Sequence, residues 1–439
     1  MTATRSKSGS SASDWRYACH VGVGLLVAAL LTRTWLVQGL IVPIELSAGS
    51  MAPAYLGPHR MVRCDACSFR FACGLDRLPA GGDAVCPNCG ERGNDLAHRA
   101  DRLGTRVLLD RTAFARRPPR RWESIVFRCP AAAQQYCLKR VVGLPGEAVE
   151  IRQGDIFVDG RIARKTLDQT RAMKLLVHDA AFVPAAASAS APRWQPRAAA
   201  SHWREIAPGH FKFDSGRAKA GPLDWLEFRP LDDRPMTDDI GYNQGETRRL
   251  NLIQDVGLSA VIEAAGTEAA GSGVLALQAV DGAESFEVRL DPPSGLIELH
   301  HNGRRAARAS IAPDRLRKTV LELFLVDRRL LLAVGGETML AYPYRRGASD
   351  RTRSNSPLAI GASRLAVELT QLRVWRDVYY TYTDPGVGRV RRGIGGPYSL
   401  AAAEFFVLGD NSPISQDSRT LPSGGIPAKL IVGKPLLRE

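Results

Sequence analysis

The sequence is poor in cysteine, with 8 among 439 residues, too few for a small domain stapled by disulfides. Its long apolar stretch is confined to the region near the N-terminus, which excludes a transporter with many membrane spans. With 45% hydrophobic and 24% charged residues, the composition also excludes a coiled coil and a disordered chain. A foldable chain of about two to four domains remains.

Acidic residues are also in deficit, because 45 Asp and Glu against 59 Lys and Arg leave a net charge of +14. Such a balance suits an anionic membrane surface or a nucleic acid, and charge alone does not distinguish the two. The 41 Gly and 27 Pro residues favour turns and strands over helix bundles. We therefore expect a mainly β fold.

The apolar stretch covers residues 17–42. A helix of that length is about 39 Å long, enough to cross a bilayer with some tilt. Basic residues ahead of it place segment 1–16 in the cytoplasm and the rest of the chain on the exoplasmic or periplasmic side. Residues 21–31 alone could be the core of a cleaved signal peptide, but no Ala-x-Ala-like site follows closely. We expect an uncleaved, single-pass anchor in the cytoplasmic membrane.

Three short segments carry candidate chemistry. Ser50 begins a Ser-Met-Ala-Pro sequence just beyond the apolar stretch. Lys139 lies on a predicted strand over residues 136–142, where burial would lower the lysine pKa enough for general-base work. Residues 406–419 run from a strand into a polar loop that contains Ser415. Taken singly, the segments are also typical of a turn, a solvated lysine and an Asx-rich turn.

Together and in this order, the segments resemble the bacterial type I signal peptidases, membrane-anchored Ser-Lys proteases that remove signal peptides from exported precursors. The resemblance rests on Ser-Met-x-Pro, on Lys-Arg-x-x-Gly-x-Pro-Gly-Glu from Lys139, and on Gly-Asp-Asn…Ser-x-Asp-Ser-Arg near the C-terminus. It covers residues 15–60, 101–165 and 400–435. It implies Ser50 as the nucleophile, Lys139 as the general base and Ser415 as the hydroxyl that orients the lysine.

The resemblance also implies supporting residues: Gly409, Asp410 and Asn411 shape the loop, and Asp417 and Arg419 form an ion pair behind the site. The residues themselves fit this chemistry, because a serine needs an adjacent base and a neutral lysine serves without His or Asp. No cofactor is then required for catalysis, and the Ser50 N–H supplies one oxyanion donor. The chain departs from the family at Ala48, where some members carry a hydroxyl that completes the oxyanion hole.

Four cysteines form a pattern of their own between residues 61 and 98. Cys64 and Cys67 make one Cys-x2-Cys pair, and Cys86 and Cys89 make a second. This spacing predicts a zinc ribbon with a structural Zn²⁺. Two disulfides are the alternative on the exoplasmic side of a membrane. For a ribbon in that location we expect a structural or substrate-docking role and no nucleic-acid partner.

A second insertion separates the lysine segment from the C-terminal motif. Residues 183–202 read as an Ala/Ser/Pro-rich linker, and residues 203–382 contain short alternating runs such as 274–280, 321–326 and 330–334. Such runs predict an all-β sandwich. It resembles the concanavalin-like lectin and laminin-G jelly rolls, which implies protein or carbohydrate as a partner, or a spacer role.

The expected architecture is therefore an anchor and a peptidase core interrupted by a ribbon and a sandwich. The core consists of residues 43–60, 101–182 and 383–439. The expected function is removal of signal peptides from exported preproteins at the lipid bilayer. A self-cleaving repressor-type Ser-Lys protein is disfavoured by the anchor. A surface receptor that uses the lectin-like domain, with a degenerate peptidase core, is the remaining alternative.

Overall fold

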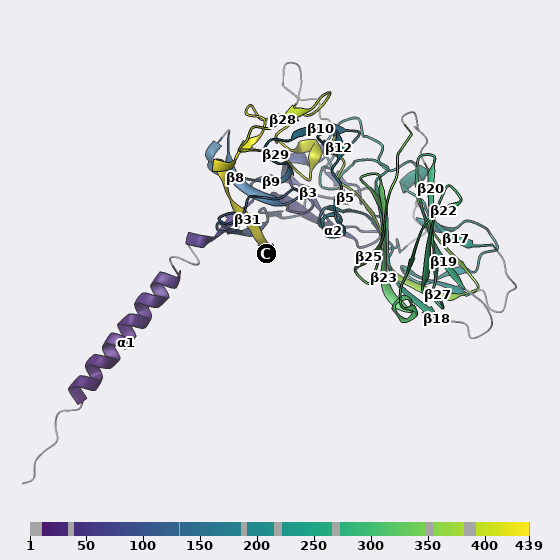
Figure 1. The fold of residues 1–439 in the computed structure, drawn as a ribbon, viewed down its shortest axis with the longest axis horizontal. Helices are drawn as coiled ribbons and strands as arrows, with labels where there is room; N and C mark the ends of the chain where they lie inside the picture. The colour runs from purple at the N-terminus through teal and green to yellow at the C-terminus, as the bar shows by residue number, and fades with distance from the viewer. Residues whose placement is uncertain are drawn as a thin grey trace, which may run out of the picture.

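The computed structural model describes residues 11–33, 39–130, 132–185, 191–214, 222–265, 273–347, 354–381 and 392–438. Within these residues the protein is mainly β, as the sequence predicts. Figure 1 shows a long helix that projects from a β core, and a separate β-sandwich on the opposite side of that core.

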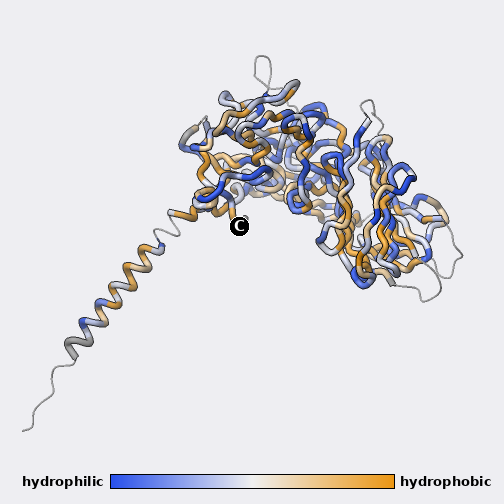
Figure 2. The backbone as a smooth tube through the Cα atoms, viewed as in Figure 1, coloured by the Kyte–Doolittle hydropathy of each residue, from blue (hydrophilic) through white to orange (hydrophobic). Residues whose placement is uncertain are grey.

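The projecting helix is α1 (Ser11–Thr32), which Figure 2 shows to be largely hydrophobic. Its segment Trp15–Thr32 is long and apolar enough to cross a membrane, and 0% of it is buried against the protein. These properties are consistent with the predicted anchor. Residues 1–10 and 34–38, which belong to the predicted N-terminal segment and anchor, lie outside the described residues.

The β core is built on a seven-stranded sheet with the order β1-β7-β31-β8-β9-β29-β30. Its strands, in that order, are Ile41–Glu45, Arg106–Asp110, Ile431–Arg438, Ser124–Cys129, Ala132–Gly143, Glu404–Leu408 and Ile426–Pro427. Residues from the beginning, middle and end of the chain thus share one sheet, even though two insertions separate them. This pairing brings the three motif segments together.

A smaller sheet continues the core. It has the order β12-β11-β10-β28, with strands Arg161–Ile162, Asp155–Val158, Ala148–Arg152 and Tyr398–Ser399. Asp159 and Gly160 join β11 to β12 with φ angles of 48° and 75°. Two consecutive positive φ values are the geometry that an Asp-Gly hairpin provides.

The first insertion forms two small sheets around the four motif cysteines. One has the order β3-β2-β6 and the other pairs β4 with β5. Their strands are β2 (His59–Arg63), β3 (Arg70–Gly74), β4 (Asp83–Ala84), β5 (Asn94–Asp95) and β6 (Asp101–Arg102). The cysteines contribute to the apolar core of this unit together with Val62, Phe71 and Leu96.

The second insertion is a sandwich of two antiparallel sheets with a common apolar core. The first sheet runs β15-β16-β27-β18-β23-β24-β25, at Trp203–Ala207, His210–Asp214, Ala366–Arg376, Val256–Ala265, Lys318–Val326, Arg329–Val334 and Glu337–Pro343. The second runs β14-β17-β26-β19-β20-β21-β22, at Trp194–Pro196, Asp224–Phe228, Leu358–Ser363, Val274–Asp281, Glu284–Asp291, Leu296–His301 and Arg304–Ser310. The strands that the alternating runs predict are present.

The sandwich sheets begin earlier in the chain than the expected boundary at residue 203. Strand β13 (Leu175–Asp179) pairs with β27, and β14 pairs with β17. The Ala/Ser/Pro-rich composition of 183–202 hides β14, and residues 186–190 lie outside the described residues. Residues 175–182, which were expected in the peptidase core, thus add an edge strand to the sandwich.

Helix α2 (Leu167–Met173) and a buried lysine join the sandwich to the core. A capping box between Thr166 and Gln169 starts the helix, and Leu167 packs on the outer face of the sandwich against Phe324. Just before it, the Lys165 amine lies 2.5 Å from a carboxylate oxygen of Asp327 and 2.8 Å from one of Asp377. Burial would lower the pKa of Lys165, but these two carboxylates raise it.

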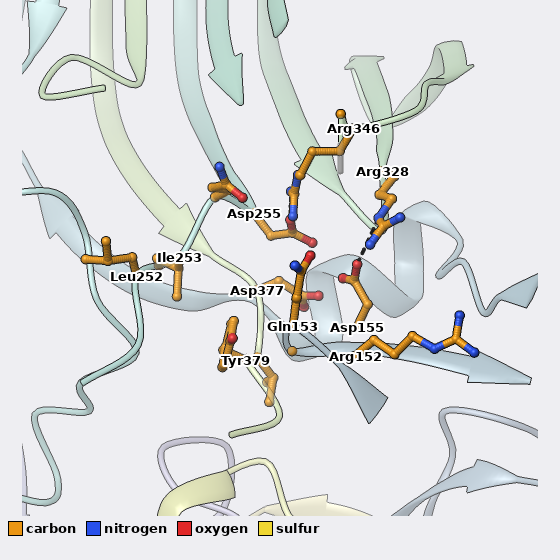
Figure 3. Close-up of a pocket in the computed structure, with 14 residues that line it drawn as sticks. Arg152, Gln153, Asp155, Leu252, Ile253, Asp255, Arg328, Arg346, Asp377 and Tyr379 are labelled. Carbon is orange, nitrogen blue, oxygen red and sulfur yellow. Dashed lines mark hydrogen bonds and ion pairs between the residues drawn. The ribbon is translucent and has the colours of Figure 1, made fainter. Parts of the chain in front are cut away.

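A cavity of about 620 Å³ lies along this joint. Figure 3 shows Asp155 from β11 facing Arg328 from the β23–β24 turn, with Arg346 and Asp255 nearby. The Asp155 and Arg328 side chains are 3.2 Å apart. Neither Ser50 nor Lys139 lines this cavity.

Replacing the joint lysine should destabilise the sandwich–core contact. In Lys165→Met, Asp327 and Asp377 lose their shared cation while they stay buried, and we expect the free energy of unfolding to fall by about 3–5 kcal/mol. The matched control is Lys318→Met, because the Lys318 side chain is 70% exposed. Chemical unfolding followed by tryptophan fluorescence measures both. Equal stability of the two variants would show that the buried lysine does not hold the joint.

Candidate active site

Ser50 and Lys139 meet in the structure although 89 positions separate them in the sequence. Ser50 follows β1 in a short loop, and Lys139 lies near the C-terminal end of β9, the strand next to β8 and β29 in the central sheet. The Lys139 amine is hydrogen-bonded to the Ser50 hydroxyl. The arrangement therefore places a basic nitrogen directly on the oxygen of a candidate nucleophile.

Lys139 is 4% exposed. Burial lowers the pKa of this amine to about 8, with Arg419 acting in the same direction, while the Asp417 and Asp410 carboxylates act to raise it. Desolvation dominates because a buried ammonium loses its hydration. A lysine with this pKa is partly neutral near physiological pH and can accept a proton from a hydroxyl.

Arg140 follows Lys139 on β9 and holds the loop after β29. Its guanidinium makes two hydrogen bonds to the Asp410 carboxylate, at 2.7 and 2.5 Å, and a third at 2.7 Å to the Trp122 carbonyl. Both side chains are almost fully buried. This bidentate ion pair has a specific geometry and fixes the start of the Gly409–Asn411 segment.

Gly409 and Asn411 bring that segment against the loop of residues 46–56, which carries Ser50 and is called the nucleophile loop below. A Cβ at position 409 would collide with the Ser415 hydroxyl and with the Ser50 carbonyl oxygen. The Asn411 backbone N–H donates to the Ser50 carbonyl at 3.1 Å, and its side-chain amide donates to the Gly49 carbonyl at 3.0 Å. Only glycine at position 409 permits this approach.

Asp417 and Arg419 form a buried ion pair close to the lysine. Two hydrogen bonds of 2.8 Å join the side chains. Burial would raise the pKa of Asp417, but Arg419 outweighs it and lowers the pKa. Arg419 also donates to the Ser412 hydroxyl at 2.8 Å, which places the pair behind the loop that carries Ser415.

Ser415 lies in the site, where the resemblance implies a hydroxyl that orients the lysine. It is 9% exposed, and no hydrogen bond joins its hydroxyl to Lys139 among the described residues. Its position next to Gly409 places it beside the Ser50 backbone. The lysine-orienting role of Ser415 therefore stays a prediction.

The base of the nucleophile loop is held by Gly104 and Thr105. The Leu56 N–H donates to the Thr105 hydroxyl at 2.9 Å, and the Thr105 backbone bonds to Leu46 and Leu56 at 3.2 and 2.8 Å. A Cβ at Gly104 would collide with the Leu46 carbonyl. These contacts close the loop from residue 46 to residue 56 and fix the backbone around Ser50.

The four motif cysteines converge in the first insertion. Their sulfurs lie within 4.8 Å of one another, an arrangement that could hold a metal ion. The closest contacts join the two Cys-x2-Cys pairs: Cys64 to Cys89 at 3.6 Å and Cys67 to Cys86 at 3.8 Å. All four are free thiols and buried in the structure. The disulfide alternative within each pair is therefore not what the structure adopts.

A disulfide does occur elsewhere, between Cys129 and Cys137. These residues belong to the neighbouring strands β8 and β9, and their Cα atoms are 5.3 Å apart. The two cysteines are 8 positions apart, and the sequence motifs assign a partner to neither of them.

Sequence reasoning also missed residues of the sandwich insertion that reach the site. Asn243 and Asn411 exchange two side-chain hydrogen bonds, at 2.8 and 2.9 Å. The Tyr242 ring occupies the position where a Cβ on Gly49 would lie. The stretch from Asp238 to Glu246 is polar and shows no hydrophobic periodicity. Contacts between residues so far apart in the sequence leave no local pattern that could predict them.

Comparison with known proteins agrees with the motif reading over part of the chain. Residues 18–210 match the family described as signal peptidase, peptidase S26. Over 65 residues the chain is 29% identical to a probable signal peptidase I-2 of Synechocystis sp., a match that covers 14% of this chain and 30% of that protein. The chain thus matches less than a third of the length of this curated relative.

Two solved structures illustrate the structural matches. The carbohydrate binding module CBM66 from Bacillus subtilis is 11% identical over 42% of this chain and 92% of its own, with a TM-score of 0.24. The exoplasmic/lumenal domain of VIP36 is 10% identical over 44% and 86%, with a TM-score of 0.28. Scores this low carry no argument about this chain. By sequence, residues 18–210 are similar to the peptidase S26 signal peptidases.

Proposed function

We propose that this protein is a membrane-anchored serine endopeptidase that removes signal peptides from exported preproteins through Ser50 and Lys139. The observation that carries the proposal is the hydrogen bond between the Lys139 amine and the Ser50 hydroxyl, made by a lysine whose pKa burial lowers to about 8. A surface lysine would be charged and could not accept the serine proton. The match of residues 18–210 to peptidase S26 supports the same reaction class.

The chemistry follows from these two groups. Neutral Lys139 accepts the Ser50 proton while the oxygen attacks the scissile carbonyl. The resulting oxyanion is stabilised by the Ser50 N–H, which donates no hydrogen bond among the described residues. Lys139 then gives its proton to the leaving amine as the peptide bond breaks, leaving an ester on Ser50. A water molecule, deprotonated by Lys139, hydrolyses the ester and restores the serine.

The anchor and the disulfide suit a site on the exoplasmic face of the cytoplasmic membrane. Helix α1 precedes β1, so Ser50 lies close in sequence to the end of the membrane segment. Disulfides such as Cys129–Cys137 persist in oxidising compartments. A receptor with a degenerate peptidase core has no need of a buried lysine bonded to a serine, which disfavours that alternative.

We also propose that the four cysteines hold one structural Zn²⁺. Tetrahedral zinc with Zn–S bonds of about 2.3 Å separates its sulfurs by about 3.8 Å, and the Cys64–Cys89 and Cys67–Cys86 sulfurs are 3.6 and 3.8 Å apart. Four thiolates around one Zn²⁺ leave a net charge of about −2. The buried Arg193 guanidinium interacts with the charges of Cys86 and Cys89. The cluster thus has a cation to offset that charge.

Removing the side chain of Ser50 or of Lys139 should abolish cleavage. We expect Ser50→Ala and Lys139→Ala each to lower kcat by about 10⁴-fold or more, and the double variant to lose no more than either single one. Cleavage of a synthetic precursor by the detergent-solubilised protein, mapped by mass spectrometry, measures this. Lys429→Ala, at an exposed position, is the control. Near-normal cleavage by Lys139→Ala would refute the proposed base.

The pH dependence should follow the lysine. Because the neutral amine is the active form, kcat/KM should rise with pH and level off above the Lys139 pKa of about 8. Initial rates from about pH 6 to about pH 10 on one peptide give the profile. A profile that is flat through about pH 8, or that falls there, would contradict a lysine base.

The metal proposal predicts about one zinc per chain in the purified protein. Cys86→Ser should lose the zinc and lower the stability of the ribbon. Cys73→Ser should keep it, because Cys73 is buried outside the cluster of four. Elemental analysis of the three proteins measures this. Metal-free protein with disulfides inside the Cys64–Cys67 and Cys86–Cys89 pairs would contradict the site.

A further inference from the structure

The segment from Met236 to Ile253, which we call the arm, is a long loop of the sandwich insertion whose two ends are joined by hydrogen bonds. Its two ends pair through the Ile253 N–H and Met236 carbonyl at 3.0 Å, and through the Asp238 N–H and Asn251 carbonyl, also at 3.0 Å. The Asp238 carboxylate accepts two 2.9 Å hydrogen bonds from Arg248, which lies within the same segment. The segment is thus an ordered arm with its own internal support.

The tip of the arm carries Asn243, which is 6% exposed. Its amide N–H donates to the Asn411 side-chain carbonyl at 2.8 Å, and the Asn411 amide donates back at 2.9 Å. That same Asn411 amide donates to the Gly49 carbonyl at 3.0 Å. A chain of amides therefore connects the inserted domain to the residue that precedes the nucleophile.

The Tyr242 ring also packs against the backbone at Gly49. A Cβ on Gly49 would overlap the Tyr242 ring, and so would a Cβ on Gly74. The Tyr242 hydroxyl donates to the Pro58 carbonyl at 3.1 Å, and its own carbonyl accepts from the Gly74 N–H at 2.9 Å. The arm thus contacts Gly49 within the nucleophile loop and Pro58 just beyond it.

The next two residues of the arm bind the cysteine ribbon. The Gln244 side chain exchanges hydrogen bonds with the Val85 backbone, at 2.9 and 3.1 Å. The Gly245 N–H donates to the Arg77 carbonyl at 2.6 Å. These contacts join the arm to the ribbon and involve neither Asn411 nor the backbone at Gly49 and Ser50, so they provide a natural control for the Asn243 contact.

We propose that Asn243 is a positioning residue of the active site: through Asn411 it fixes the backbone at Gly49 and Ser50. This inference rests on the proposed peptidase function and adds that the inserted domain completes the site. Two observations favour positioning over simple packing. The contact consists of paired, directional hydrogen bonds between buried amides, and it ends on the Gly49 carbonyl, next to the N–H proposed to stabilise the oxyanion.

The test compares Asn243→Ala with Gln244→Ala in the full-length, detergent-solubilised protein. We expect Asn243→Ala to lower kcat by about 10–100-fold, as a small misplacement of reacting groups does, with KM changed by less than about 3-fold. Gln244→Ala should leave kcat within about 3-fold of wild type. Wild-type kcat in a folded Asn243→Ala protein would overturn the proposal.

Two further variants separate positioning from damage to folding. Asn243→Gln keeps both the donor and the acceptor of the side-chain amide and should recover part of the lost kcat. Asn243→Ala in an Asn411→Ala background should cost much less than it does alone, because both changes remove the same contact. Additive losses, or equal losses in Asn243→Gln and Asn243→Ala, would point to a structural role only.

Hydrogen exchange gives a readout that does not depend on activity. Amides of residues 47–56 should exchange faster in Asn243→Ala than in Gln244→Ala, since only the former loses the Asn411 link. If the wild-type protein cleaves no precursor, the proposed function fails while this measurement still tests the positioning. Identical exchange in the two variants would overturn the positioning itself.

Discussion

A lysine amine withheld from water is the constraint on which the proposed chemistry depends. Burial lowers the pKa of Lys139, but only while no carboxylate is free to pair with it. The two nearest acidic residues each have an arginine of their own: Arg140 pairs with Asp410, and Arg419 pairs with Asp417. Removing either arginine would leave a buried carboxylate whose best remaining partner is the lysine. These ion pairs therefore keep the pKa of the lysine low as well as holding the loops.

The nucleophile loop lies where four parts of the chain meet. Its base is held by Thr105, its carbonyls accept from Asn411, and its glycine faces Tyr242 of the sandwich insertion. The cysteine ribbon follows directly at β2 and is itself bound by Gln244. Neither insertion is thus a detached appendage. The sandwich insertion contacts the site through Asn243, and the cysteine ribbon binds the same arm through Gln244.

Much of this arrangement could be predicted from the sequence, because its signals are local. Alternating runs predict the sandwich strands, and cysteine spacing predicts the cluster of four. The motifs around Ser50 and Lys139 indicated a contact that the structure contains. For the strands and the cysteines, the residue types and their spacing within one short segment carry the physical reason, whereas the Ser50–Lys139 contact follows from the resemblance.

The remainder depends on contacts that no local pattern encodes. Asn243 and Asn411 are 168 positions apart, and an asparagine in a polar loop is typical of any turn. The sandwich begins early because β13 pairs with β27, which the sequence between them does not reveal. The Cys129–Cys137 bond depends on the register of β8 against β9. Ser415 was assigned its contact by resemblance, and the structure places its hydroxyl beside Gly409 without a bond to the lysine.

The central claim, that burial lowers the pKa of Lys139 far enough for its neutral form to act as the base, is tested most directly by titrating that one amine. Lysine labelled with ¹³C at Cε reports its own protonation in the NMR spectrum, and Lys139→Arg identifies the resonance by its loss. We expect the resonance that is lost in Lys139→Arg to titrate with a midpoint at about 8 in the wild-type protein. A midpoint near 10.5, the ordinary value for a lysine in water, would mean that Lys139 is charged, and the proposed mechanism would fail.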